Sequence, residues 1–417
     1  MNLRYDLEEK PPPAEFLAIS IQWLALTASL LIIGGRVVAE IQYESGFEKT
    51  IYLQKVFFIA GMSLLAQLFF GHRLPLVFGP SAVLIVAIYA NLESGLLAIY
   101  TAIAICGAIL FIFAMTGKMS LLRSLFTERV VAVVLLLVAI SLIPAIMDLI
   151  LNDSPPYSFL FSMILLLSLI ILSITLKGFW NSSIIIFALL FGSAIYLIIF
   201  PQQLAISEFE FTNFFYDLIP NFSFRVELIF AFLICYLALA INDLSSIYSL
   251  GRLLKANEME KRIKKGVSLT GISNIFSGFF GVVGMVNYTL SPGMISTTKC
   301  ASRFPLVPVG VILIIFAFIP SVISIFGAIP RTVIGTIFLY LMCSQVALAF
   351  TMIKVEDVDS GLVIGFPVLL AVLITFIPES AMSFFPEILK PILGNSFVVG
   401  VLSAMLMEAI AKRYESS

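Results

Sequence analysis

The sequence predicts an all-α membrane protein that crosses the bilayer many times. Of its 417 residues, 60% are hydrophobic and only 12% are charged, and the mean hydropathy is +1.10. Apolar runs recur along the chain from Phe16 to Ile410. A bilayer core of about 30 Å needs about 20 apolar residues per helix, which is the length of these runs. A soluble fold would have to stack many helices that are apolar on every face, which globular domains rarely do.

Charged residues and breaks rich in Pro and Gly separate the apolar runs into candidate transmembrane segments. Fourteen segments are predicted, at 16–38, 51–71, 76–91, 95–116, 128–150, 158–176, 182–200, 225–248, 267–283, 286–298, 305–326, 331–352, 360–377 and 394–411.

The distribution of basic residues predicts the orientation, because Lys and Arg collect in cytoplasmic loops. With the N-terminus inside, 18 of the 24 Lys and Arg residues fall on the cytoplasmic side and six fall on the other side. One missed or extra segment would remove this asymmetry. We therefore expect a multi-pass protein of the cell (plasma or inner) membrane with both termini in the cytoplasm.

The longest loop on the opposite side, at 201–224, leaves seven segments before it and seven after it. An odd number in each half forces the halves into opposite orientations. This arrangement is an inverted repeat, which many secondary transporters use to build a site at the bilayer midplane.

Two segments at matching positions of the halves contain a break. The third carries FGPSAVLI at 78–85, and the tenth carries LSPGMIST at 290–297. Pro removes a backbone donor and Gly permits unusual dihedrals, so a half-helix that starts here would point free N–H groups at the middle of the membrane. Irregular backbone at that depth survives only against protein or a wet cavity, so the pair predicts a binding site. The alternative is a simple helix kink whose backbone groups are satisfied by Ser and Thr.

Asp243, in LALAINDLSSIYSLG, is the deepest acidic residue within a predicted segment. Ionisable residues inside membranes are costly and are usually functional. Two interpretations stay open for Asp243: it takes part in proton coupling, or it is a structural carboxylate near the end of its helix.

Several short motifs resemble those of the nucleobase/ascorbate transporters, also called xanthine/uracil permeases. SNIFSGFFG at 273–281 resembles the signature of their span 9, and IPRTVIG at 329–335 resembles that of span 12. The stretch from Gly293 to Lys299 fits part of the span 10 signature, while SIQW at 20–23 and GPSA at 79–82 resemble spans 1 and 3. The resemblance covers nearly the whole chain in order.

The resemblance implies that a core domain (spans 1–4 and 8–11) moves against a gate domain (spans 5–7 and 12–14), with short antiparallel strands from spans 3 and 10 at the site. It also implies proton- or sodium-coupled uptake of uracil, xanthine or related bases, with no cofactor beyond the coupling ion, and a homodimer through the gate domain. The corresponding parts are a cytoplasmic tail (1–15), core (16–117), gate (118–200), an extracytoplasmic linker (201–224), core (225–326), gate (327–411) and a second tail (412–417).

The chain departs from the family at the positions that hold the base. The span 8 acidic position matches Asn242, and the span 10 Glu or Gln falls on Leu290, which can neither donate nor accept a hydrogen bond. Asn242 and backbone N–H groups near Ala82 and Ser291 are expected to bind the solute, Trp23 or Tyr288 to stack on it, and Asp243 to carry the coupled ion. The full set of expected substrate-binding residues is Trp23, Ser81, Ala82, Asn242, Ser246, Tyr288, Thr289, Leu290 and Ser291.

Two other functions were weighed against nucleobase transport. A small-anion transporter on the same fold would use the two half-helix N-termini instead of acidic residues. A membrane enzyme would need parts that the chain lacks, since its single histidine, His72, lies in a predicted loop and no metal-binding or paired-carboxylate motif is present. For a transporter, replacement of His72 by Ala is expected to leave activity intact. A net charge of −1 without basic stripes gives no signal for nucleic acid polymers, so the expected partners are the lipid bilayer and a small molecule.

Overall fold

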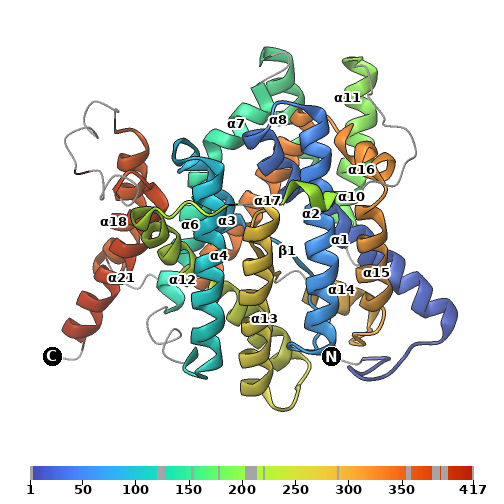
Figure 1. The fold of residues 1–417 in the computed structure, drawn as a ribbon, viewed down its shortest axis with the longest axis horizontal. Helices are drawn as coiled ribbons and strands as arrows, with labels where there is room; N and C mark the ends of the chain where they lie inside the picture. The colour runs from blue at the N-terminus through green and yellow to red at the C-terminus, as the bar shows by residue number, and fades with distance from the viewer. Residues whose placement is uncertain are drawn as a thin grey trace.

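The computed structural model describes residues 3–119, 127–151, 155–176, 179–201, 214–218, 221–288, 291–353, 358–377, 386 and 393–415 (Figure 1). Each of the fourteen predicted ranges coincides with a helix, a series of short helices, or a strand followed by a helix. The first half contains α1 (Pro13–Gln42), α2 (Gly46–Phe69), β1 (Phe78–Pro80), α3 (Ala82–Tyr89), α4 (Leu96–Met115), α6 (Glu128–Ser141), α7 (Ile143–Leu151), α8 (Pro155–Thr175), α9 (Phe179–Ser182), α10 (Ile184–Phe187) and α11 (Ser193–Ile199).

The second half repeats this order. It contains α12 (Val226–Leu253), α13 (Met259–Phe280), β2 (Met285–Asn287), α14 (Ser291–Thr298), α15 (Leu306–Ala317), α16 (Pro320–Gly327), α17 (Arg331–Met352), α18 (Val358–Thr375) and α21 (Ser396–Glu415). In both halves the third segment is a strand that leads into a helix of eight residues. The start of α1 and the end of α21 lie on the same side of the molecule, in the lower part of Figure 1. An even number of membrane crossings requires this arrangement.

Within the described residues, seven helices are long and apolar enough to cross a membrane, and a bent helix pair makes an eighth candidate. The other predicted segments are shorter or more polar than a simple span. The predicted span at 305–326 is not straight, because α15 and α16 meet at 92°. Pro320, at the first position of α16, cannot continue the ladder of α15 and marks the break.

The two halves meet in a two-stranded antiparallel sheet, as the resemblance implies. Phe78 pairs with Asn287, Gly79 with Val286, and Pro80 with Met285. All six residues are buried. A hydrogen-bonded strand pair satisfies backbone groups that would otherwise be exposed to a membrane interior, so each half completes the broken segment of the other.

Helix packing also joins one half to the other. In Figure 1, α4 and α13 run side by side through the centre, and α2 packs along α15. In the repeat, α2 is the counterpart of α13, and α4 is the counterpart of α15. The two contacts are therefore equivalent by the symmetry of the halves. Both contacts depend on glycine: a Cβ on Gly107 of α4 would lie 2.8 Å from the backbone N of Ile275, and one on Gly61 of α2 would lie 2.8 Å from the carbonyl O of Gly310. Small residues at such contacts let membrane helices approach closely.

Most of the described helices form two packing groups. One group contains α1 to α4 and α12 to α16, and the other contains α6, α7, α8, α17, α18 and α21. The groups resemble the expected core and gate domains, but α9, α10 and α11, which fall in the expected gate range, belong to neither group: α9 contacts α14, and α10 contacts both α1 and α8. The domain boundaries and the movement of one group against the other stay predictions, and most of the expected linker, at 202–213, lies outside the described residues.

Candidate functional site

The starts of α3 and α14 lie at the two ends of the strand pair. The Ser81 N–H, just before α3, donates to the carbonyl O of Gly284 at 2.9 Å, and the Tyr288 N–H donates to the carbonyl O of Val77 at 2.8 Å. The Val77 N–H in turn donates to the hydroxyl of Ser291, the first residue of α14, at 3.2 Å. Both half-helices therefore begin beside the sheet, where their first N–H groups lack partners within the helix.

Tyr288 fastens the two strands together with its side chain. Its hydroxyl donates to the carbonyl O of Pro80 at 2.5 Å. Its ring lies over Gly79, where a Cβ would come within 2.9 Å of the ring carbon Cε2. A residue larger than glycine at position 79 would displace the ring, so this glycine permits the close approach of the two half-spans.

Asp243 of α12 reaches the end of β2. Its Oδ1 accepts hydrogen bonds from the backbone N–H of Asn287 at 3.1 Å and from the side-chain Nδ2 of Asn287 at 2.7 Å. Asp243 is fully buried, and its second oxygen, Oδ2, has no hydrogen-bond partner among the described residues. A buried carboxylate oxygen without a donor is costly, so Oδ2 is available to an incoming donor or cation.

Ser246 holds the same end of β2 from one turn further along α12. Its hydroxyl is within hydrogen-bond distance of the Asn287 carbonyl O at 3.0 Å and of the Asn242 carbonyl O at 2.8 Å. Residues three apart lie on one face of a helix. The Asp243 carboxylate therefore accepts from the N–H groups of Asn287, while the Ser246 hydroxyl faces the carbonyl O of the same residue.

His72, in the loop between α2 and β1, contacts Asn287 on its other side. His72 Nε2 lies 3.0 Å from Asn287 Oδ1, and His72 Nδ1 accepts from the Leu74 N–H at 2.9 Å. Burial lowers the pKa of this imidazole to about 3, so His72 is neutral at physiological pH.

Polar side chains of α13 surround this chain of contacts. Asn274 accepts from the Met285 N–H at 2.6 Å and donates to the Met285 carbonyl O at 3.2 Å, which fixes the start of β2. The Thr270 hydroxyl lies near Asp243 but donates to the carbonyl O of Gly266 at 3.2 Å, and it accepts from Gln67 Nε2 of α2 at 3.1 Å. The site is therefore bounded by α2, α12, α13 and both strands.

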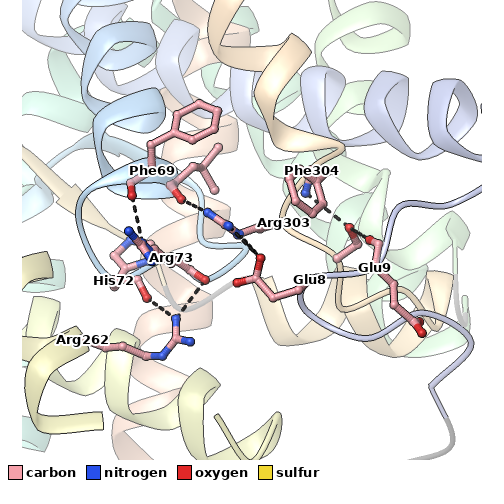
Figure 2. Close-up of polar contacts among 10 residues, drawn as sticks. Glu8, Glu9, Phe69, His72, Arg73, Arg262, Arg303 and Phe304 are labelled. Carbon is pink, nitrogen blue, oxygen red and sulfur yellow. Dashed lines mark hydrogen bonds and ion pairs between the residues drawn. The ribbon is translucent and has the colours of Figure 1, made fainter. Parts of the chain in front are cut away.

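Two arginines connect the site to the end of the molecule where the chain begins (Figure 2). Arg262 of α13 donates to the carbonyl O of His72 at 2.8 Å and of Arg73 at 3.2 Å. Arg303 pairs with Glu8 at 2.7 Å and donates to the carbonyl O of Leu68 in the last turn of α2. A cation at a helix C-terminus compensates the negative end of the helix dipole.

A family model described as the Permease family (Xan_ur_permease) matches residues 15–380. The match covers both strands, both half-helices and the residues around Asp243. The chain belongs to this permease family. It is therefore a multi-pass membrane protein of the transporter class, as the sequence motifs indicate.

Known relatives of this permease carry matching names. The uric acid permease PucK of Bacillus subtilis (strain 168) is 23% identical over 97% of this chain and 97% of its own length. The uric acid permease PucJ of the same organism is 24% identical, over 81% of this chain and 79% of its own length.

The fold of the permease is shared with a solved transporter structure. The transmembrane domain of the cyanobacterial bicarbonate transporter BicA superposes with a TM-score of 0.62, at 16% identity, over 92% of this chain and 96% of that domain. This likeness confirms the predicted architecture.

The permease brings five of its expected site residues together through the strands: Ser81, Asp243, Ser246, Tyr288 and Ser291. The Ser81 hydroxyl is buried without a partner among the described residues. Ala82 and Asn242 are partly buried, and no described residue hydrogen-bonds to the Asn242 side chain. Thr289 and Leu290 lie outside the described residues.

Trp23 is fully buried in α1, and its indole Nε1 has no partner in the described part of the chain. No hydrogen bond connects it to the strands among those residues, so its stacking role stays a prediction. Sequence reasoning missed Asn287 and His72 as site residues. The signals were present: Asn287 opens the polar stretch before the break, and His72 is the single histidine of the chain.

Proposed function

We propose that this permease is a secondary active transporter of a nucleobase-like solute, coupled to H⁺ or Na⁺. The observation that carries the proposal is a fully buried carboxylate, Asp243, held by Asn287 where the two half-helices of an inverted repeat begin. The relatives named for uric acid supply the substrate class.

The groups near the strands suit the edge of a planar base, which presents alternating donors and acceptors. Asp243 Oδ2 accepts an N–H of the base, and the Ser81 hydroxyl and the first N–H groups of α3 and α14 donate to its carbonyl oxygens. Asn242 supplies both a donor and an acceptor, which compensates in part for the missing carboxylate at its position. Trp23 or Tyr288 stacks on the base in this proposal, and Thr289 and Leu290, which lie outside the described residues, stay expected substrate-binding residues.

The coupled ion binds at Asp243 in this proposal. The charge of a carboxylate surrounded by neutral hydrogen-bond donors can be neutralised by a proton or balanced by a bound sodium ion. Alternating access follows from movement of the core group, which holds the site, against the gate group. The remaining parts of the proposal are cytoplasmic termini and a homodimer through the gate domain.

Uptake by purified permease in liposomes tests this function. Labelled uracil, xanthine and urate are offered with an inward pH gradient, an inward sodium gradient, or neither. We expect one gradient to drive accumulation of at least one base, and Asp243→Asn to abolish the stimulation by that gradient. Glu227→Gln, which removes another acid from α12, is the matched control and keeps wild-type uptake. Failure to take up any base under every gradient would reject the substrate class.

A small-anion transporter is the second candidate, since α3 and α14 both begin at the strand pair and N-termini attract anions. Asp243 Oδ2 is a hydrogen-bond acceptor, which suits the N–H edge of a base better than bicarbonate or sulfate, whose atoms are mainly acceptors, and this is why the base ranks first. Bicarbonate and sulfate that displace a bound base, or that are taken up in its place, would reverse this order.

Catalysis is not part of the proposal. His72, the side chain that an enzyme would use for proton transfer, is completely buried and both of its ring nitrogens are engaged.

A further inference from the structure

The side-chain amide of Asn287 lies between a carboxylate and an imidazole. Its Nδ2 is 2.7 Å from Asp243 Oδ1, and its Oδ1 is 3.0 Å from His72 Nε2. An amide has two donors at one end and an acceptor at the other, so its orientation decides what it offers to each neighbour. The neighbours themselves must therefore fix which end faces Asp243.

The backbone sets the tautomer of His72. The Leu74 N–H donates to His72 Nδ1 at 2.9 Å, so in the neutral ring the hydrogen resides on Nε2. That N–H donates to Asn287 Oδ1, and the amide nitrogen then points to the carboxylate. In this series of hydrogen bonds, from the Leu74 N–H through His72 and Asn287 to Asp243, each donor has one acceptor.

We propose that His72 is a positioning residue, which holds the Asn287 amide in the orientation that donates to Asp243. The proposal concerns the internal order of the site, and it rests on the proposed function only where Asp243 is taken as the ion-coupling carboxylate. Nothing in the family motifs of this chain assigns a role to position 72.

The orientation of the amide determines which charge state of Asp243 is favoured. With Nδ2 toward the carboxylate, the ionised form receives a hydrogen bond. After a flip, Oδ1 would face the carboxylate, and only a protonated carboxyl could donate to it. The other group acting on Asp243 is the neutral Thr270, and the charged group acting on His72 is Arg262. His72 thereby keeps Asp243 ready to accept a cation.

A proton relay through His72 does not fit the geometry. Protonation at Nδ1 would break the hydrogen bond from the Leu74 N–H, and burial opposes the charged imidazolium. The Asn287 amide, which separates the ring from Asp243, has no titratable proton. His72 acts through Asn287 and does not exchange protons with the solute.

The single histidine allows a direct test on the intact protein. Permease labelled with ¹⁵N-histidine and freed of any polyhistidine tag gives one imidazole in an NMR spectrum. We expect a neutral ring with hydrogen on Nε2 that persists as the pH is lowered to about 5. Hydrogen on Nδ1, or protonation at neutral pH, would overturn the proposal. This result does not depend on any transported solute.

Substitutions test the consequence for Asp243. His72→Leu leaves the amide free to flip, whereas His72→Gln keeps a donor for Asn287 Oδ1. We expect the pH at which uptake is half-maximal to move upward by about one unit in His72→Leu, and by much less in His72→Gln. In the Asp243→Asn background, His72→Leu should cause no further change. A wild-type pH profile in His72→Leu would overturn the proposal, and Glu227→Gln again serves as the control.

A second measurement separates this proposal from the proposed function. The infrared carboxyl band of Asp243, assigned by its loss in Asp243→Asn, follows its protonation without a solute. If no base is taken up but this band shifts in His72→Leu as described, the substrate class fails and the positioning role stands. If the band titrates as in wild type, the positioning role fails. If His72→Leu does not fold, the tautomer measured by NMR and the carboxyl band of His72→Gln test the positioning role instead. We expect the band of His72→Gln to titrate nearly as in wild type.

Discussion

Asp243 and Glu40 are both buried carboxylates on long helices, and their surroundings are opposite in character. Asp243 is met by the neutral donors of Asn287, and one of its oxygens has no partner in the described part of the chain. Glu40, whose side chain is 3% exposed, is met by three cations: Arg36 at 2.8 Å, Lys49 at 2.7 Å and Arg331 at 2.5 Å. A buried carboxylate enclosed by cations has its charge balanced within the protein, whereas one held only by neutral dipoles has no counter-charge beside it.

The two carboxylates therefore differ in the role that their surroundings suit. Glu40 joins α1 and α2 of one packing group to Arg331, the first residue of α17 in the other group. Asp243 lies wholly within the first group and reaches the strands. The first carboxylate holds helices together, and the second is placed to meet a solute or ion.

Removal of the charge at Glu40 should have the largest effect on stability. Glu40→Gln leaves Arg36 and Lys49 largely buried without a counter-charge, which costs about 3–5 kcal/mol. Thermal unfolding in detergent measures this loss, with Glu15→Gln as the control because its pair with Arg4 is exposed. Equal melting temperatures for the two variants would mean that the Glu40 network does not stabilise the fold.

Neutralisation of Asp243 should instead affect binding. Asp243→Asn keeps an acceptor for the Asn287 N–H groups, so we expect little change in melting temperature. The loss of a charged acceptor should weaken solute binding by about 10- to 100-fold. Equilibrium binding to the purified variant checks this, and a collapse of stability as large as that of Glu40→Gln would contradict the contrast.

A fall in pH should destabilise the fold through His72. The folded pKa of His72 is about 3, against 6.5 for an ordinary histidine, because burial opposes the charged ring. The unfolded chain binds the extra proton first, so stability is present above pH 6.5 and is lost as the pH falls toward 3, by about 2 kcal/mol near pH 5. Melting temperatures at neutral and acidic pH measure this loss, and His72→Gln should show a smaller change. An identical pH dependence in the variant would assign it to other groups.

Loss of Arg331 should have the smallest effect. Arg331 is 31% exposed on its side chain, and Glu40 retains Arg36 and Lys49 after Arg331→Gln. We expect a loss of about 1 kcal/mol or less in thermal unfolding. A loss comparable to that of Glu40→Gln would show that the contact between the packing groups, and not charge balance, dominates the network.

The sequence was sufficient for the architecture because apolar length, charge asymmetry and Pro-Gly breaks act locally. The breaks at Pro80 and Pro292 predicted both short helices and their symmetry. The bend between α15 and α16 was missed, since an apolar run with Pro320 inside it reads as one span until packing decides its direction.

The site was harder to predict because its contacts are long-range. Asn287 and His72 are separated by 215 positions, and no periodicity links them. His72→Ala was expected to be harmless on the assumption that a loop histidine is idle. That expectation stays untested, but the burial of His72 against Asn287 leads us to expect a loss instead, because the substitution would leave a buried amide oxygen without its donor.

The crosswise packing of α4 with α13 and of α2 with α15 has a consequence for biosynthesis. When the ribosome has delivered only the first seven segments to the membrane, the glycine-containing faces of α2 and α4 lack α15 and α13, the helices that cover them in the complete fold. Insertion of the early helices and their final packing are therefore separate events. Cellular quality control has its longest opportunity to intercept the chain between the synthesis of α2 and that of α15.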